Sequence, residues 1–389
     1  MRTPKPLIAP LLSLMLLGGC YLSHGRDTRD AGAPPGLRDS GLRDAGSPGR
    51  DAGPPDAGPP DAGAEDAGPP RALRWIELGP DAEHPPARLN HLAVYDRDLD
   101  RVIVFGCFDP YGEVGGCCLT PYIHHFDVWG LDMRTQTWTR LAELPENLLA
   151  THPMEVAHDR ANDRLVFIAQ TDFDGGPSRV FALELGSWSL TRLPSGPWPA
   201  RSGPLRSAFD PAANELVVHD AVFEDTTGGT WALDLGTDTW STVETEDAPE
   251  VRFHTPLSSA GAGTFYMYGG FAHAGDGVGE LWRLDRRRGR WTPVVLDAEQ
   301  VGRWSHRAIY EPVRGRLVVF GGSRGVVGRG TLLIDPRSGA TEEAELEPAP
   351  GFRRDFTMVL DSRRRRAIVF GGALESTRAY GDSWALELP

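Results

Sequence analysis

Several short motifs in this 389-residue chain contain residue types used in catalysis or metal binding, but none has the setting that the chemistry needs. Gly321-Gly-Ser-Arg-Gly325 matches the Gly-x-Ser-x-Gly pattern of a nucleophilic serine, which requires a strand, a strained turn and a helix. Here an apolar run leads into a glycine-rich loop, and Gly325–Gly330 lacks the helix of a phosphate-binding loop. Asp172-Phe-Asp-Gly-Gly176 has no glutamate at calcium-loop spacing. We therefore predict no catalytic residue, no metal and no cofactor.

The basic residues are almost all arginine. Lys5 is the only lysine, which excludes Walker A, Schiff-base and Ser-x-x-Lys chemistry from the rest of the chain. The net charge of −14 argues against nucleic-acid binding.

Five arginines recur, each just before an expected first strand: Arg88, Arg201, Arg252, Arg303 and Arg353. Thr151 occupies the corresponding position in the second repeat. Guanidinium groups bind carboxylates and phosphates through paired N–H donors, so we predict that these arginines bind an anionic ligand. The alternative is that each arginine pairs with backbone or acidic groups of its own repeat. We expect Arg303→Ala combined with Arg353→Ala to abolish anion binding and to leave the melting temperature nearly unchanged.

A sequence repeat supplies the elements that must position these arginines. An apolar run ending at glycine occurs in near-copies at residues 101–106, 264–270, 316–322 and 366–372, and in weaker form at 164–170 and 215–221. Most runs follow a turn that starts with an acidic residue, such as Asp96 or Glu311, and usually ends with a cation five residues later. A further strand and usually a tryptophan complete each unit. The pattern predicts six four-stranded units with a period of about fifty residues, which is an all-β fold.

This repeat resembles the kelch family over residues 71–389. The resemblance rests on Phe-Gly-Gly at Phe320 and Phe370, on Arg-x-x-His at Arg88 and Arg303, and on the tryptophans that end the units. It implies a six-bladed β-propeller of four-stranded antiparallel blades, in which each first strand lines a central channel. The five arginines would then gather around one mouth of that channel, where similar kelch adaptors hold acidic peptide segments.

The sixth unit ends after its third strand and lacks the outer strand and its tryptophan. The run Arg74-Trp-Ile-Glu-Leu78 has no unit of its own and contains a tryptophan. We predict that this N-terminal strand near Trp75 becomes the outer strand of the last blade and closes the ring, which removes open sheet edges.

The N-terminus has the features of an exported lipoprotein. Residues 1–19 place Arg2 and Lys5 before an apolar stretch that is too short to span a bilayer, as in a signal peptide. Leu17-Gly-Gly-Cys20 resembles a bacterial lipobox, which implies acylation of Cys20; an ordinary secretory signal is the alternative. Tyr21 in place of an aspartate implies the outer membrane of a Gram-negative cell, facing the periplasm or the medium. Residues 20–70 carry six Asp-Ala-Gly triplets and few large apolar residues, so we predict a disordered tether.

The remaining three cysteines lie in one long loop of the first repeat: Cys107, Cys117 and Cys118. An oxidising envelope favours a disulfide from Cys107 to one of the other two, and the sequence leaves the choice open. Zinc is the alternative, because His124 and His125 follow the loop. Adjacent residues of a strand point to opposite faces, which argues against a shared metal ion.

These observations predict a monomeric, membrane-anchored and non-enzymatic lipoprotein that presents a binding face to an envelope or extracellular protein or to an anionic glycan. The alternative is an enzyme acting on acidic sugars at the same channel mouth, of the kind implied by the resemblance to kelch sialate mutarotases.

Overall fold

The computed structural model describes residues 72–80, 83–106, 108–109, 123–145, 155–169, 178–197, 205–219, 229–250, 252–272, 277–323, 330–374 and 378–389. Within these ranges every regular element is a strand. None of the described residues forms a helix long and apolar enough to cross a membrane.

Six four-stranded antiparallel sheets make up the fold, and we number them as blades in chain order. Blade 1 contains β2 (Leu92–Asp96), β3 (Arg101–Phe105), β6 (Asp127–Asp132) and β7 (Thr137–Glu143). Blade 2 contains β8 (Ala157–Asp159), β9 (Arg164–Ala169), β10 (Arg179–Glu184) and β11 (Leu190–Arg192). Blade 3 contains β12 (Arg206–Asp210), β13 (Glu215–His219), β14 (Thr230–Asp234) and β15 (Thr239–Thr242).

The second half of the ring repeats this order. Blade 4 contains β17 (Leu257–Gly261), β18 (Thr264–Tyr268), β20 (Leu281–Asp285) and β21 (Arg290–Val294). Blade 5 contains β22 (Arg307–Glu311), β23 (Arg316–Phe320), β24 (Thr331–Ile334) and β25 (Thr341–Ala344). Blade 6 contains β26 (Thr357–Asp361), β27 (Arg366–Phe370), β30 (Ser383–Glu387) and β1 (Arg74–Glu77). Three short pairs lie outside the blades: β4 (Phe108–Asp109) with β5 (Ile123–His124), β16 (Arg252–Phe253) with β19 (Phe271–Ala272), and β28 (Ala373–Leu374) with β29 (Arg378–Ala379).

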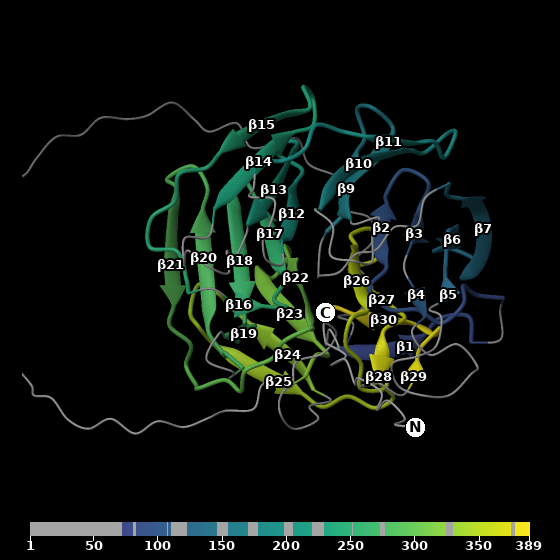
Figure 1. Cartoon of the computed structure of the whole chain (residues 1–389). Helices are drawn as coiled ribbons and strands as arrows, with labels where there is room; N and C mark the ends of the chain where they lie inside the picture. The colour runs from purple at the N-terminus through teal and green to yellow at the C-terminus, as the bar shows by residue number, and fades with distance from the viewer. Residues whose placement is uncertain are drawn as a thin grey trace, which may run out of the picture. The chain divides into compact units, whose positions relative to one another are not determined.

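The blades follow one another around a centre in chain order (Figure 1). Six buried apolar clusters hold them together, and each cluster takes its side chains mainly from two consecutive blades, including the pair formed by blades 6 and 1. This arrangement is a six-bladed β-propeller, as the repeat predicts.

The N-terminal strand closes the ring, which confirms the prediction for Trp75. Strand β1 pairs antiparallel with β30, with Arg74 opposite Glu387 and Trp75 opposite Leu386. The Trp75 side chain is buried, its ring lies 4.7 Å from that of Phe320 in blade 5, and its Nε1 donates to Thr331 Oγ1 at 3.2 Å. One strand from the start of the domain therefore fixes the end of the domain in place.

The connections between strands divide the propeller into two faces. Each first-to-second and third-to-fourth hairpin turns at one face, which we call the turn face, and hydrogen bonds join these turns in pairs, for example from Met133 N to Asp100 O at 3.0 Å. The predicted acid-to-cation turns are present there, with Arg101 Nε 3.1 Å from Asp96 and Arg164 Nε 2.9 Å from Asp159. The second-to-third connections and the links between blades lie at the opposite face, which we call the loop face.

The glycines that end the second strands are required by the backbone at the loop face. Gly322 has a φ of 84°, and a Cβ atom there would lie 2.6 Å from the carbonyl oxygen of Trp304. Only glycine adopts this conformation and this close approach without strain. Ser323 follows, and its backbone forms a bridge with Trp304. Gly321, Gly322 and Ser323, the described part of the Gly-x-Ser-x-Gly match, are thus part of the blade scaffold.

Candidate functional site

Four of the five predicted arginines are described, and all four side chains are buried at equivalent places in their blades: Arg88, Arg252, Arg303 and Arg353. In each case Nη1 donates to the carbonyl oxygen of the first residue after the second strand. These distances are 3.4 Å to Gly106, 3.3 Å to Gly269, 3.4 Å to Gly321 and 3.0 Å to Gly371. The repeat therefore places the arginines alike, and each one binds the glycine turn of its own blade.

Each of these arginines also forms an ion pair with a carboxylate of its own blade. The distances are 2.8 Å for Arg88 and Asp127, 3.0 Å for Arg252 and Glu280, 2.8 Å for Arg303 and Glu343, and 2.8 Å for Arg353 and Asp382. The carboxylate side chains are between 11% and 59% exposed, whereas no arginine side chain exceeds 4%. An anionic ligand would have to compete with these carboxylates. The geometry agrees with the structural alternative, and ligand binding by the arginines stays a prediction.

A tryptophan completes three of the four ion pairs. Trp129, Trp282 and Trp384 each donate Nε1 to the carboxylate two residues earlier, at 2.8, 3.0 and 2.7 Å. The sequence carries this signal as an acidic residue, one other residue and a tryptophan at the third strand. Blade 5 has no such acid, and Glu343 on its outer strand reaches Arg303 instead. The arginine, acid and tryptophan form one unit that the arginine spacing alone does not reveal.

The protonation of Asp382 follows from this unit. Burial raises its pKa, but the hydrogen bonds and positive charge of Arg353 and the hydrogen bond from Trp384 lower the pKa further than burial raises it. The net pKa lies below the usual value, so Asp382 is ionised at neutral pH and neutralises the buried guanidinium group.

The rim at the start of the inner strands is formed by residues two positions after each arginine. Asn90, His254, Ser305 and Asp355 all have positive φ angles, between 51° and 55°. Backbone hydrogen bonds link them from blade to blade: Ser305 N to His254 O at 2.7 Å, Asp355 N to Ser305 O at 3.2 Å, and Asn90 N to Asp355 O at 2.9 Å. Asparagine and aspartate tolerate this conformation better than most residues, which is the only sequence signal for the rim.

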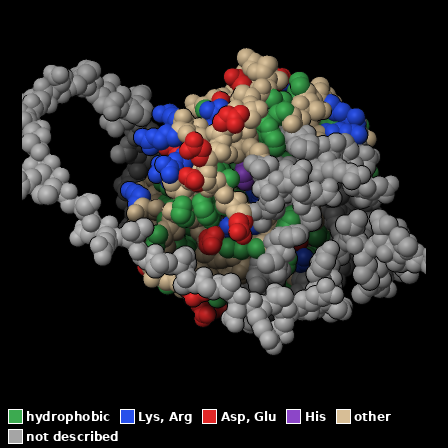
Figure 2. All heavy atoms as spheres, turned by 60° about the vertical axis from the view of Figure 1, so that its left-hand side comes forward, with side chains coloured by type: hydrophobic (Ala, Val, Ile, Leu, Met, Phe, Trp, Pro, Cys, Tyr) green, Lys and Arg blue, Asp and Glu red, His purple; other side chains and the backbone are tan. Residues whose placement is uncertain are grey.

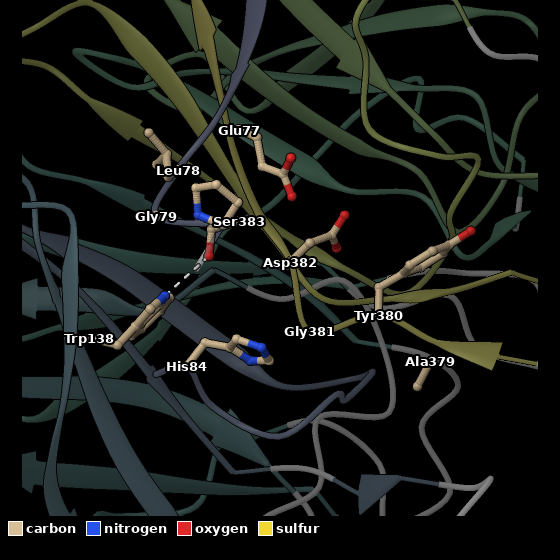
Figure 3. A pocket seen from close by; sticks show the side chains of 11 residues that line it. Glu77, Leu78, Gly79, His84, Trp138, Ala379, Tyr380, Gly381, Asp382 and Ser383 are labelled. Atoms are coloured by element: carbon tan, nitrogen blue, oxygen red, sulfur yellow. Dashed lines mark hydrogen bonds between the residues drawn. The ribbon is translucent and has the colours of Figure 1, made fainter. Parts of the chain in front are cut away.

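A cavity of about 330 Å³ opens at the seam between blade 6 and blade 1. Loop-face connections form most of its wall, from Leu78 to Pro80 on one side and from Ala379 to Asp382 on the other. Figure 3 shows Asp382 between Glu77 and Tyr380, with Trp138 and His84 across the cavity. This volume is at the lower end of the range for small-ligand sites.

The cavity wall combines aromatic rings and carboxylates. Trp138 Nε1 donates to Ser383 Oγ at 3.2 Å, which joins the two blades beneath the cavity. The Arg353 guanidinium group lies 4.4 Å from the centre of the Tyr380 ring and pairs with Asp382, so a predicted arginine contacts the cavity wall without entering the cavity. Glu77 is exposed. Arg353 balances the negative charge of Asp382, so the carboxylate of Glu77 is the unbalanced charge of the cavity wall. This wall favours a neutral or basic ligand group over an anion.

Among the described residues, one possible cation site lies at the turn face, formed by Asp96, Asp98 and His158, whose ligand atoms lie within 4.8 Å of one another. Arg101 and the backbone N–H groups of Asp98 and Leu99 already bind the Asp96 carboxylate, and Arg160 binds the Asp98 carboxylate. These carboxylates therefore have protein partners in place of a metal ion.

Several predicted positions lie outside the described residues: Cys20, Cys107, Cys117, Cys118 and Arg201. The lipid anchor, the disulfide and the fifth arginine accordingly stay predictions. The chain matches no protein-family model and no curated protein.

Proposed function

We propose that this chain is a lipid-anchored, non-enzymatic propeller of the outer membrane that presents its loop face to a binding partner. The kelch assignment, the acylation of Cys20 and the outer-membrane location belong to this proposal and rest on the sequence motifs described above. The closed propeller supports a binding role, because rigid blades that carry loops on one face are a common scaffold for recognition.

The observation that carries the proposal is the seam cavity on the loop face. It is large enough for a side chain or a small ligand, and it offers aromatic and charged groups from two blades. Among the two classes of partner, the cavity favours a protein over an anionic glycan. Glu77 and Asp382 line it, and the Arg353 charge is already neutralised by Asp382. A basic or hydroxyl-bearing side chain suits this wall better than a carboxylated sugar.

Photo-crosslinking from the cavity tests the proposal. A crosslinking residue replaces Glu77 in one variant and Arg140 in a control variant, because Arg140 is 53% exposed on the outer strand β7. We expect a discrete protein adduct from position 77, suppressed by excess unlabelled chain and missing from position 140. Equal labelling from both positions would reject the cavity as the binding site. Thermal stabilisation of the chain by a free acidic sugar would instead favour the acidic-sugar enzyme.

A further inference from the structure

The turn face has an uneven distribution of charge. In blades 4 to 6 the turns span residues 261–264, 285–290, 311–316, 335–340 and 361–366 and hold eleven arginines and four acidic residues. In blades 1 to 3 the turns span residues 96–101, 132–137, 159–164, 184–190, 210–215 and 234–239 and hold five arginines and eleven acidic residues. A chain with a net charge of −14 therefore carries a basic half-face, which we define as the turns of blades 4 to 6.

The arginines of the basic half-face differ in their exposure and in their partners. Some are bound within the fold, such as Arg364, which pairs with Asp100 at 2.6 Å, and Arg286, which pairs with Glu215 at 2.8 Å. Others are exposed at the turn tips: Arg287, Arg288, Arg314, Arg337 and Arg363. Of these, Arg288 pairs with Asp285, Arg314 donates to Pro389 O and Arg337 donates to Arg314 O, all at the surface. Figure 2 shows one group of arginine side chains at the left of the described surface, with acidic side chains beside it, and a second group at the upper right. Exposed guanidinium groups on one side of a propeller suit an extended anionic surface.

The N-terminal segment joins the propeller beside this basic half-face. Strand β1 belongs to blade 6, and its first residue, Arg74, pairs with Glu387 at the end of β30. Leu388 N donates to Arg365 O in the first turn of blade 6, at 3.0 Å, so this end of the sheet lies at the turn face. The Arg74 side chain is 64% exposed, and its Nε pairs with Glu387 Oε2 at 2.7 Å, so this residue adds no net charge there. The first strand of the described chain therefore begins beside the basic half-face.

We propose that the basic half-face docks on an anionic phospholipid surface. Strand β1 begins on the side of the propeller that carries the cations, and the acidic turns of blades 1 to 3 are on the other half. Each arginine near an anionic bilayer contributes favourably, and the attraction is screened within about 8 Å at physiological ionic strength. The described arginines alone define the docking surface. The proposed lipid anchor at Cys20 would bring this surface close to a bilayer, and only that part rests on the proposed function.

Vesicle co-sedimentation tests the proposal with the chain from residue 21 onwards, which carries the propeller and the N-terminal segment but no acyl group. The probes are vesicles of phosphatidylglycerol mixed with phosphatidylethanolamine, and vesicles of phosphatidylcholine alone. We expect binding to the anionic vesicles only, weakening as salt rises. The test variant carries Arg287→Gln, Arg337→Gln and Arg363→Gln. The control variant carries Arg97→Gln, Arg134→Gln and Arg140→Gln, three exposed arginines of blade 1.

The test variant loses about a hundredfold in vesicle affinity if each removed arginine contributes as cations near anionic membranes usually do, and the control variant loses much less. Equal losses in the two variants, or equal binding to both vesicle types, would overturn the proposal. Salt-sensitive self-association without vesicle binding would also overturn it, and would show that the basic half-face binds the acidic turns of blades 1 to 3 in a second copy. Binding to soluble polyglutamate alone would point to an acidic protein. None of these outcomes affects the Cys20 anchor, which mass spectrometry of the acylated peptide tests separately.

Discussion

Replacing Arg353 by alanine tests whether the arginines are parts of the scaffold or ligand groups. Arg353 is fully buried and donates to Gly351 O at 3.1 Å, to Gly371 O at 3.0 Å and to both oxygens of Asp382 at 2.8 Å. Alanine removes all these bonds and leaves the Asp382 carboxylate, with a 27% exposed side chain, without its counter-charge.

The structure gives the expected magnitude. Breaking a buried ion pair costs about 3–5 kcal/mol, and partial exposure of Asp382 returns some of that cost, so we expect Arg353→Ala to lower the free energy of unfolding by about 2–4 kcal/mol. That change lowers the melting temperature by roughly 3–6 °C for a domain of this size, because the unfolding entropy is about 2.1 cal/mol/K per residue. Arg252→Ala should cost only about 1 kcal/mol, because the Glu280 side chain is 59% exposed and water can solvate it. The expectation that the melting temperature stays nearly unchanged in the Arg303→Ala, Arg353→Ala double variant therefore needs revision.

Urea denaturation and thermal melting of the variants measure these differences, with Arg288→Ala as a control because its side chain is 80% exposed. Asp382→Asn keeps the shape of the side chain and removes its charge, so it should destabilise the protein to a similar extent. The reasoning fails if Arg353→Ala melts with the parent chain. Loss of an anionic ligand without loss of stability would restore Arg353 as a ligand group.

Three further changes address the ring and its seams. Removing residues 72–79 takes away β1 and the buried Trp75, so the melting temperature should fall by more than with any single substitution above; an unchanged melt would contradict the closure. Gly322→Ala should destabilise the fold by about 1–3 kcal/mol in urea, because φ is 84° and Trp304 O lies in the way, whereas Gly186→Ala, with open space around it, should change little. Asp100 has its pKa lowered to about 2, mainly by the hydrogen bond from Arg364, against an unperturbed value of 3.8. The ionised Asp100 therefore contributes its full stabilisation above pH 4, and this stabilisation is lost as the pH falls toward 2. An Arg364→Gln variant should lose less stability than the parent chain over that interval. Parallel losses in pH-dependent melts would show that the Asp100–Arg364 pair does not stabilise the contact between blades 1 and 6.

The fold could be predicted from the sequence because its determinants are local and repeated. An apolar run with terminal glycines specifies one strand and its turn, and six copies at a near-constant spacing leave a closed ring as the way to cover every sheet edge. Trp75 was identifiable because one strand and one tryptophan were missing from the last unit. The candidate site could be predicted from the sequence only in part. The repeat locates Arg88 and its equivalents, but their burial depends on acids 28 to 40 residues later, at the start of the third strand in three blades and on the fourth strand in blade 5. The seam cavity and the two half-faces arise only when distant turns meet.

The two proposals constrain each other through the geometry of the blades. Because the loop face and the turn face lie at opposite ends of the strands, docking of the basic half-face would turn the loop face and the seam cavity away from that bilayer. A lipid anchor at Cys20 would place the propeller at an effective concentration near the millimolar range for a flexible tether, so weak electrostatic docking would be sufficient to orient it. The test variant Arg287→Gln, Arg337→Gln, Arg363→Gln should then retain the crosslink from position 77 in solution while losing vesicle binding. A variant that lost both would show that the two faces do not act independently.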